Sequence, residues 1–92
     1  MLFDRLKKRL KRKEAKKYFG LNGLDSLIEH FVNYDNGFFV ELGANDGLTQ
    51  SNTAYFEKSR GWKGVLIEPS PNKFLECIKN RSEKTITRAR LA

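Results

Sequence analysis

The chain contains two short apolar runs, each of which ends at a turn-forming or sheet-breaking residue and is followed by a helical pattern. The first run, "GFFVELG" at 37–43, precedes the stretch "SNTAYFEKSRG" at 51–61. The second, "WKGVLIEP" at 62–69, precedes "SPNKFLECIKNR" at 70–81, and β-branched residues follow in "KTITRARLA" at 84–92. Strands that alternate with short helices pair in parallel through right-handed crossovers. The order therefore predicts an α/β fold with about three parallel strands, one half of a doubly wound sheet.

Residues with known capping preferences mark the ends of the two predicted helices. Thr49 or Ser51 can cap the first helix, and Gly61 lies where that helix should end. Ser70 can cap the second helix, and Pro71 suits its first turn because proline lacks the N–H that a helix start leaves unpaired.

A further helix is predicted ahead of the first strand, with Asp25 as its N-cap and "DNG" at 35–37 as its end. Apolar residues at helical spacing should place one face of this helix, and one face of the helix over 70–81, toward a core. His30 falls off that face and is expected at the solvent side. The residues expected to face inward are Leu24, Leu27, Ile28, Phe31 and Val32 in the first, and Phe74, Leu75, Cys77 and Ile78 in the second.

The charge of the chain is confined to its first part. Residues 1–20 hold nine basic and two acidic residues, which gives all of the formal charge of +7, whereas residues 21–92 are balanced. We therefore divide the chain into a basic amphipathic leader at 1–20, a helix and turn at 21–36, and the strand-rich part at 37–92. Any electrostatic partner should be sought at the leader.

The leader carries an apolar stripe of Leu2, Phe3, Leu6 and Leu10 on one side of a helical wheel. A solvated helix or tail is the first interpretation, and peripheral contact with an anionic membrane is the second. Nucleic acid is disfavoured because it would not require the stripe. The leader lacks the apolar stretch of a secretory signal, and no run is long enough to span a bilayer, so a cytoplasmic location is expected.

Cys77 is the single cysteine of the chain. One cysteine excludes an intramolecular disulfide and a multi-cysteine metal site, and it fits a reducing compartment. No metal site is predicted.

The turn after the first strand, within "ELGANDGLTQSNT" at 41–53, has the chemistry of a ligand site. Gly43 and Gly47 allow a tight turn and a close approach of backbone to ligand. Glu41, at the strand end, can bind an ammonium group directly or through water. Glu68, at the end of the second strand, is placed to accept hydrogen bonds from the ribose hydroxyls of an adenosine. Together these residues predict an adenosine-cofactor site.

The glycine pattern bears on which cofactor binds. Dinucleotide sites prefer G-x-G-x-x-G, whereas this turn reads E-x-G-x-x-x-G, with Asn45 where a middle glycine would stand. The Gly-Lys-Ser/Thr ending of a P-loop is absent from the turn. The pattern favours S-adenosylmethionine, while an NAD-dependent oxidoreductase half remains the alternative.

The motifs "ELGANDG", "SNT", "GWKG" and "IEP", in this order and spacing, resemble the first part of the FkbM-type methyltransferase domain. The resemblance covers about half of the chain and implies a class I, Rossmann-like methyltransferase fold that uses S-adenosylmethionine. It implies transfer of a methyl group to a hydroxyl of a sugar or a natural-product-like acceptor, and it assigns no catalytic residue to this chain. The implied cofactor-binding residues are Glu41, Gly43, Ala44, Asn45, Asp46, Gly47 and Glu68.

The resemblance leaves out the later part of that domain, which completes the adenine pocket and binds the acceptor. We therefore interpret the chain as a truncated piece of an O-methyltransferase, incomplete or inactive by itself. The alternative is a non-catalytic remnant or a membrane-surface binding module that acts through the leader.

Overall fold

The computed structural model describes residues 2, 4–5 and 18–90. Most of the predicted leader at 1–20 lies outside the described residues. The elements of the described part are η1 (Leu21–Gly23), α2 (Leu24–Glu29), β1 (Phe38–Leu42), α3 (Ala54–Arg60), β2 (Lys63–Ile67), α4 (Pro71–Asn80) and β3 (Ile86–Arg88).

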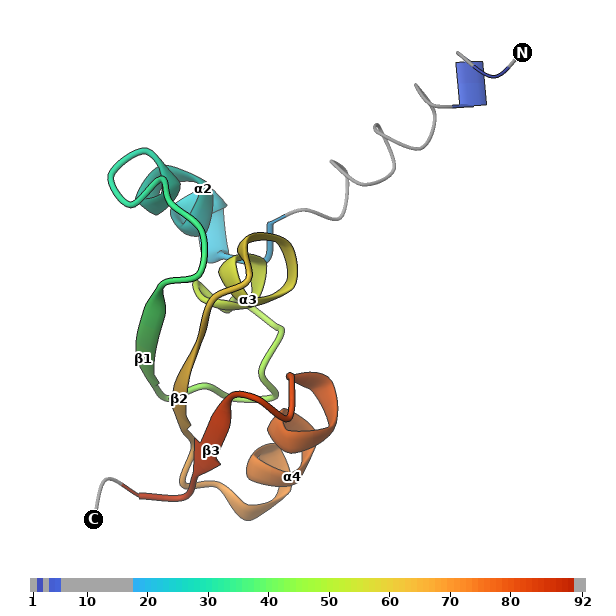
Figure 1. Cartoon of the computed structure of the whole chain (residues 1–92). Helices are drawn as coiled ribbons and strands as arrows, with labels where there is room; N and C mark the ends of the chain where they lie inside the picture. Colours follow the sequence, from blue (N-terminus) through green and yellow to red (C-terminus); the bar gives the residue numbers. More distant parts are fainter. Residues whose placement is uncertain (1, 3, 6–17, 91–92) are drawn as a thin grey trace.

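The three strands form one parallel sheet in the order β1-β2-β3. Phe39 pairs with Gly64 in the register of β1 and β2, and Val65 pairs with Ile86 in that of β2 and β3. Figure 1 shows α3 and α4 on the same side of this sheet, each as the crossover between consecutive strands. The predicted α/β fold with three parallel strands is confirmed.

The core lies between the sheet and these two helices. Phe39 of β1 and Leu66 of β2 point to the helix side and are buried together with Tyr55 and Phe56 of α3 and Cys77 of α4. The predicted burial of Cys77 is confirmed. Alternation along a strand explains the pattern, because successive side chains point to opposite faces.

The opposite face of the sheet is apolar and exposed. Phe38, Val40 and Leu42 of β1 are 63%, 60% and 65% exposed, and Ile86 of β3 is 51% exposed. The strand register places all four on one face, since Phe38, Val40 and Leu42 alternate with the buried side of β1, and Ile86 lies in the row of Val40 through Val65.

Residues 18–36 pack against α3 and the start of β2. The rings of Tyr18 and Tyr55 lie 4.6 Å apart, and the Trp62 indole N–H donates to the carbonyl of Tyr34 at 2.7 Å. Arg60 of α3 forms an ion pair with Glu29 of α2 at 2.7 Å. No helix in the described part of the chain is long and apolar enough to cross a membrane.

Asp25 is not the N-cap of α2; that position is held by Gly23. Instead, the fully buried carboxylate of Asp25 accepts hydrogen bonds from the backbone N–H groups of Phe19 and Gly20, at 2.7 and 2.9 Å, and from that of Ser26. The side chain therefore fixes the chain ahead of the helix, because those N–H groups have no helical partner of their own.

The inward faces predicted for two helices are only partly confirmed. Ile28 and Val32 pack against the core, and His30 is exposed as expected. However, Leu24, Leu27 and Phe31 near α2, and Leu75 and Ile78 of α4, are exposed. Periodicity identified the apolar stripe, but each helix has a neighbour along only part of that stripe.

Candidate functional site

The turn between β1 and α3 is held against the end of β2 by backbone hydrogen bonds. The N–H groups of Gly43 and Ala44 both donate to the carbonyl of Ile67, at 2.8 and 3.0 Å, and the N–H of Gly47 closes the turn onto Ala44 at 2.9 Å. Ala44 is buried, which anchors the turn in the core. The predicted loop therefore lies at the carboxyl ends of two neighbouring parallel strands.

Glycine is required at the two positions of the turn, Gly43 and Gly47, for different structural reasons. Both adopt a positive φ, 70° at Gly43 and 88° at Gly47. At Gly43 an added Cβ would meet no atom within 4 Å, so this side of the turn is open to a ligand. At Gly47 it would lie 2.9 Å from Cγ of Arg81 and 3.1 Å from Sγ of Cys77. Gly47 thus permits the close approach of α4.

Glu68 is brought to the turn, as the strand order predicted. Its Oε1 accepts the N–H of Asn45 at 2.6 Å, and its Oε2 accepts the N–H of Ser70 at 2.9 Å. The residue is only 8% exposed. Each carboxylate oxygen has a second lone pair, so Glu68 can hold the turn and still accept a hydroxyl.

Asp46 stabilises its own loop. Its carboxylate accepts the N–H groups of Leu48 and Thr49 and the hydroxyl of Thr49, at 2.7 to 2.9 Å. The bond from the Thr49 side chain is the main cause that lowers the pKa of Asp46 below its ordinary value, and the backbone bonds act in the same direction. Asn80 at the end of α4 donates to the Asp46 carbonyl at 2.9 Å.

Glu41 is held through one of its two carboxylate oxygens. The hydroxyls of Ser51 and Thr53 both donate to Oε1, at 3.0 and 2.5 Å. Within the described part of the chain, Oε2 accepts no hydrogen bond. Ser51 also accepts the N–H of Ala54, the first residue of α3, at 3.1 Å. "SNT" therefore organises the helix start and also orients the acid. The N-cap position of α3 is held by Thr53, neither of the two predicted residues, although Ser51 Oγ does accept an N–H at the helix start.

Arg81, which follows the last residue of α4, connects these parts. Its side chain is 1% exposed, and its terminal nitrogens donate to four acceptors. A cation–π contact places the guanidinium carbon 5.3 Å from the centre of the Phe39 ring. The four acceptors are the Gly47 carbonyl at 3.0 Å, Ser51 Oγ at 3.3 Å, Thr53 Oγ1 at 3.0 Å and Glu57 Oε2 at 3.1 Å.

Sequence reasoning did not identify Arg81 or Asn80 as part of this site. Both contact residues of the loop that lie 34 positions earlier in the chain. A close approach of α4 could have been suspected at Gly47, because a glycine between helix and loop leaves room for a neighbouring element. No spacing rule indicates which side chain of that element fills the room.

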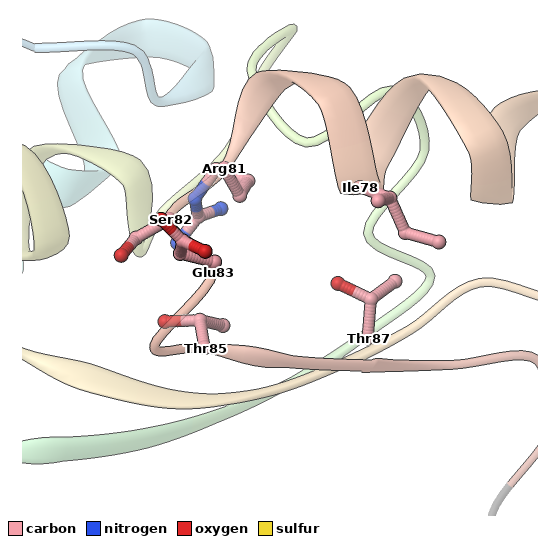
Figure 2. Close-up of a pocket in the computed structure, with 6 residues that line it drawn as sticks. All are labelled: Ile78, Arg81, Ser82, Glu83, Thr85 and Thr87. Atoms are coloured by element: carbon pink, nitrogen blue, oxygen red, sulfur yellow. The ribbon is translucent and has the colours of Figure 1, made fainter.

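Two of the pockets in the described part of the chain lie near the predicted site and along the sheet. Figure 2 shows one of about 410 Å³ between the end of α4 and β3, where Ile78 and Thr87 face each other. Its lining includes none of the predicted cofactor-binding residues. The other, of about 380 Å³, follows β1 and joins Glu41 to Asn52 and Thr53, with apolar walls from Ile28 and Phe56 among others. Glu41 therefore lies at the margin of an apolar groove.

Two further titratable side chains of the described part, those of Cys77 and Glu57, are buried. Cys77 is fully buried, and this burial raises the pKa of its thiol. The side chain of Glu57 is buried as the ion-pair partner of Arg81. Among the described residues, no three His, Cys, Asp or Glu side chains are grouped so that they could hold a metal ion.

The geometry can be compared with known protein families. Residues 41–92, more than half of the chain, match the family model described as the methyltransferase FkbM domain. No significant similarity to the chain was found among curated proteins or among solved structures. The matched stretch begins at Glu41 and includes the turn, Glu68, α4 and β3. The chain therefore belongs to the methyltransferase FkbM domain family.

Proposed function

We propose that this chain provides the S-adenosylmethionine-binding part of an O-methyltransferase. One observation carries the proposal: Glu41 near the end of β1 and Glu68 directly after β2 lie at the carboxyl ends of two neighbouring parallel strands, on either side of the glycine turn in the sequence, and Glu68 is hydrogen-bonded to that turn. Ligands of open α/β sheets bind at this position, beyond the carboxyl ends of the strands. Membership of the methyltransferase family supports a methyl donor as that ligand.

The residues present fit such a donor. Glu41 offers Oε2, which accepts no hydrogen bond from the described residues, as the oxygen for the ammonium of the methionine part. Gly43 leaves open space beside the turn. Glu68 keeps lone pairs for the ribose hydroxyls while it holds the N–H of Asn45. No pyrophosphate need be accommodated, because Asn45 stands where a dinucleotide site prefers glycine.

When bound, the donor supplies an electrophilic sulfonium methyl group. The chain's own residues bind and orient: Glu41 would hold one end of the donor and Glu68 the ribose, so that the methyl group faces an acceptor hydroxyl in a fixed direction. Positioning of this kind removes much of the entropic part of a transfer barrier. We propose a hydroxyl of a sugar or natural-product-like molecule as the acceptor, on the basis of the family resemblance.

Calorimetric titration of the chain with S-adenosylhomocysteine tests the site. Glu68→Ala should weaken binding about tenfold or more, because it removes a charged acceptor from the ribose hydroxyls. Gly43→Val should weaken it comparably, since a β-branched side chain would enter the open side of the turn and would be strained at a φ of 70°.

Two controls accompany this titration. Glu76→Ala removes an exposed carboxylate on α4 that forms an ion pair with Lys73, so the affinity of this variant should equal that of the unmodified chain. Thermal unfolding of each variant separates lost binding from lost folding. Unchanged affinity in folded Glu68→Ala and Gly43→Val, or displacement of S-adenosylhomocysteine by equimolar NAD, would contradict the proposal.

A further inference from the structure

Arg81 is a buried cation that the proposed cofactor chemistry does not use directly. Its terminal nitrogens carry four N–H bonds, and four acceptors surround them: a carbonyl of the turn, two hydroxyls and the Glu57 carboxylate. A guanidinium with 1% side-chain exposure needs such partners, because an unpaired buried charge is strongly unfavourable. Three of the four partners belong to residues 47–53, in the loop and at the start of the helix behind it.

The direction of these hydrogen bonds has a consequence for Glu41. Arginine can only donate, so Ser51 Oγ and Thr53 Oγ1 must accept from Arg81 through their lone pairs. Each hydroxyl has a single proton, and that proton is then free to point away from Arg81. In both residues it points to the same atom, Oε1 of Glu41.

The carboxylate of Glu41 is thereby made asymmetric. Oε1 accepts two hydroxyl protons, whereas Oε2 accepts none from the described residues. Without Arg81, the Thr53 hydroxyl could rotate its proton to another acceptor, and Glu41 would lose the shorter of its two links. The Ser51 hydroxyl would keep the backbone N–H groups of Thr53 and Ala54 as its donors. Arg81 also holds the carbonyl of Gly47, which keeps the turn in place relative to Glu41.

We propose that Arg81 is a positioning residue of the cofactor site: through Ser51 and Thr53 it orients Glu41 so that Oε2 faces the ammonium of the donor's amino-acid part. This inference rests on the proposed function. It predicts that Arg81 matters for the amino-acid end of the ligand and not for the adenosine end.

Two ligands distinguish the two ends. S-Adenosylhomocysteine carries the amino-acid group, whereas 5′-methylthioadenosine has the same nucleoside and sulfur but lacks that group. The ratio of their dissociation constants, measured by calorimetry on the full chain, reports the contribution of the amino-acid end. A general loosening of the fold would weaken both ligands together and leave the ratio unchanged.

Arg81→Lys keeps the charge beside Glu57 but cannot reach all four acceptors with one ammonium. It should weaken S-adenosylhomocysteine about tenfold and 5′-methylthioadenosine by less than about twofold. Thr53→Val removes the shorter link to Glu41 and one of the four acceptors of Arg81 but keeps the guanidinium itself, and we expect the same selective loss. Arg81→Met should show the largest change in the ratio of the two dissociation constants. If this variant does not fold, Arg81→Lys and Thr53→Val are sufficient for the test.

Thr85→Val is the matched control. It removes a buried hydroxyl that donates to Glu57 Oε2 at 2.7 Å, so it perturbs the same polar cluster without touching the link to Glu41. The ratio of the two dissociation constants in Thr85→Val should equal that of the unmodified chain. Equal weakening of both ligands in Arg81→Lys and Thr53→Val, or an unchanged ratio, would overturn this inference alone. An unmodified chain that binds neither ligand would overturn the proposed function and the inference together.

Discussion

The carboxylate of Asp46 takes its hydrogen bonds from residues of its own loop, the N–H groups of Leu48 and Thr49 and the hydroxyl of Thr49. These bonds favour the ionised form and lower the pKa of Asp46 below the ordinary value of 3.8. A carboxyl whose pKa is lowered by folding stabilises the folded chain above its unfolded pKa. This stabilisation is lost as the pH falls through the folded pKa.

We therefore expect part of the stability of the chain to disappear below about pH 4 through Asp46. Thr49→Val removes the main cause of the shift, so the pKa of Asp46 should rise toward 3.8. Titration of the Asp46 carboxyl carbon by NMR measures this directly. The same titration midpoint in Thr49→Val and in the unmodified chain would contradict the assignment.

The contacts of single residues were predictable where strand topology alone determined them. Glu41 lies near the end of β1 and Glu68 directly follows β2, so their placement at the same end of the parallel sheet followed from the order of the elements. Arg81 was not predictable in this way. Its place depends on how closely α4 approaches Gly47 and on the rotamer of a long side chain, and neither is encoded in local spacing.

At the scale of elements, β1 and β2 approach so closely at one pair that only glycine fits. A Cβ at Gly64 would lie 2.0 Å from the carbonyl oxygen of Phe39 and 2.8 Å from its ring. These are atoms of the neighbouring strand and of a buried core ring, so they cannot yield as an exposed flexible side chain would.

Gly64→Ala should therefore lower the free energy of unfolding by about 1–3 kcal/mol or more, through overpacking between the strands. Gly23→Ala provides the comparison, because Gly23 has a φ of 72° but no atom within 4 Å of the added Cβ. That variant carries only backbone strain of about 1–2 kcal/mol. Urea unfolding of both variants measures these losses, and a Gly64→Ala variant as stable as the unmodified chain would contradict the close approach.

Element order was predictable because strand and helix patterns alternate clearly along residues 37–88. The outward faces of the helices were not. Leu75 and Ile78 lie on the apolar stripe of α4, yet they are exposed, because the sheet reaches only the side of α4 that carries Cys77. A hydrophobic stripe predicts that one face of a helix can be buried. The width of the neighbouring element determines how much of that face is buried.

At the scale of the whole molecule, a basic segment precedes a body without net charge. We propose that residues 1–20 contact anionic membrane surfaces, with basic residues at the headgroups and the apolar stripe of Leu2, Phe3, Leu6 and Leu10 toward the acyl chains. The full chain should co-sediment with vesicles containing phosphatidylserine and not with neutral vesicles. Replacing Lys7, Lys8 and Lys11 by glutamine should reduce this binding at least about tenfold, since each charge contributes about 1 kcal/mol.

Three exposed lysines of the body, Lys63, Lys79 and Lys84, form a control set of equal charge. Their replacement by glutamine should leave vesicle binding within about twofold if the leader carries the contact. Equal binding to neutral and anionic vesicles, or equal loss in the two triple variants, would contradict the assignment to the leader.

The 34 positions that separate Arg81 from Gly47 also matter during protein synthesis. A chain emerges from the ribosome with its N-terminal residues first. Glu41 and its loop therefore leave the ribosome before the guanidinium that orients them. On the nascent chain the Glu41 carboxylate is present before Arg81 can orient it. Its fixed orientation becomes possible only after the end of α4 has been synthesised and has packed against the loop.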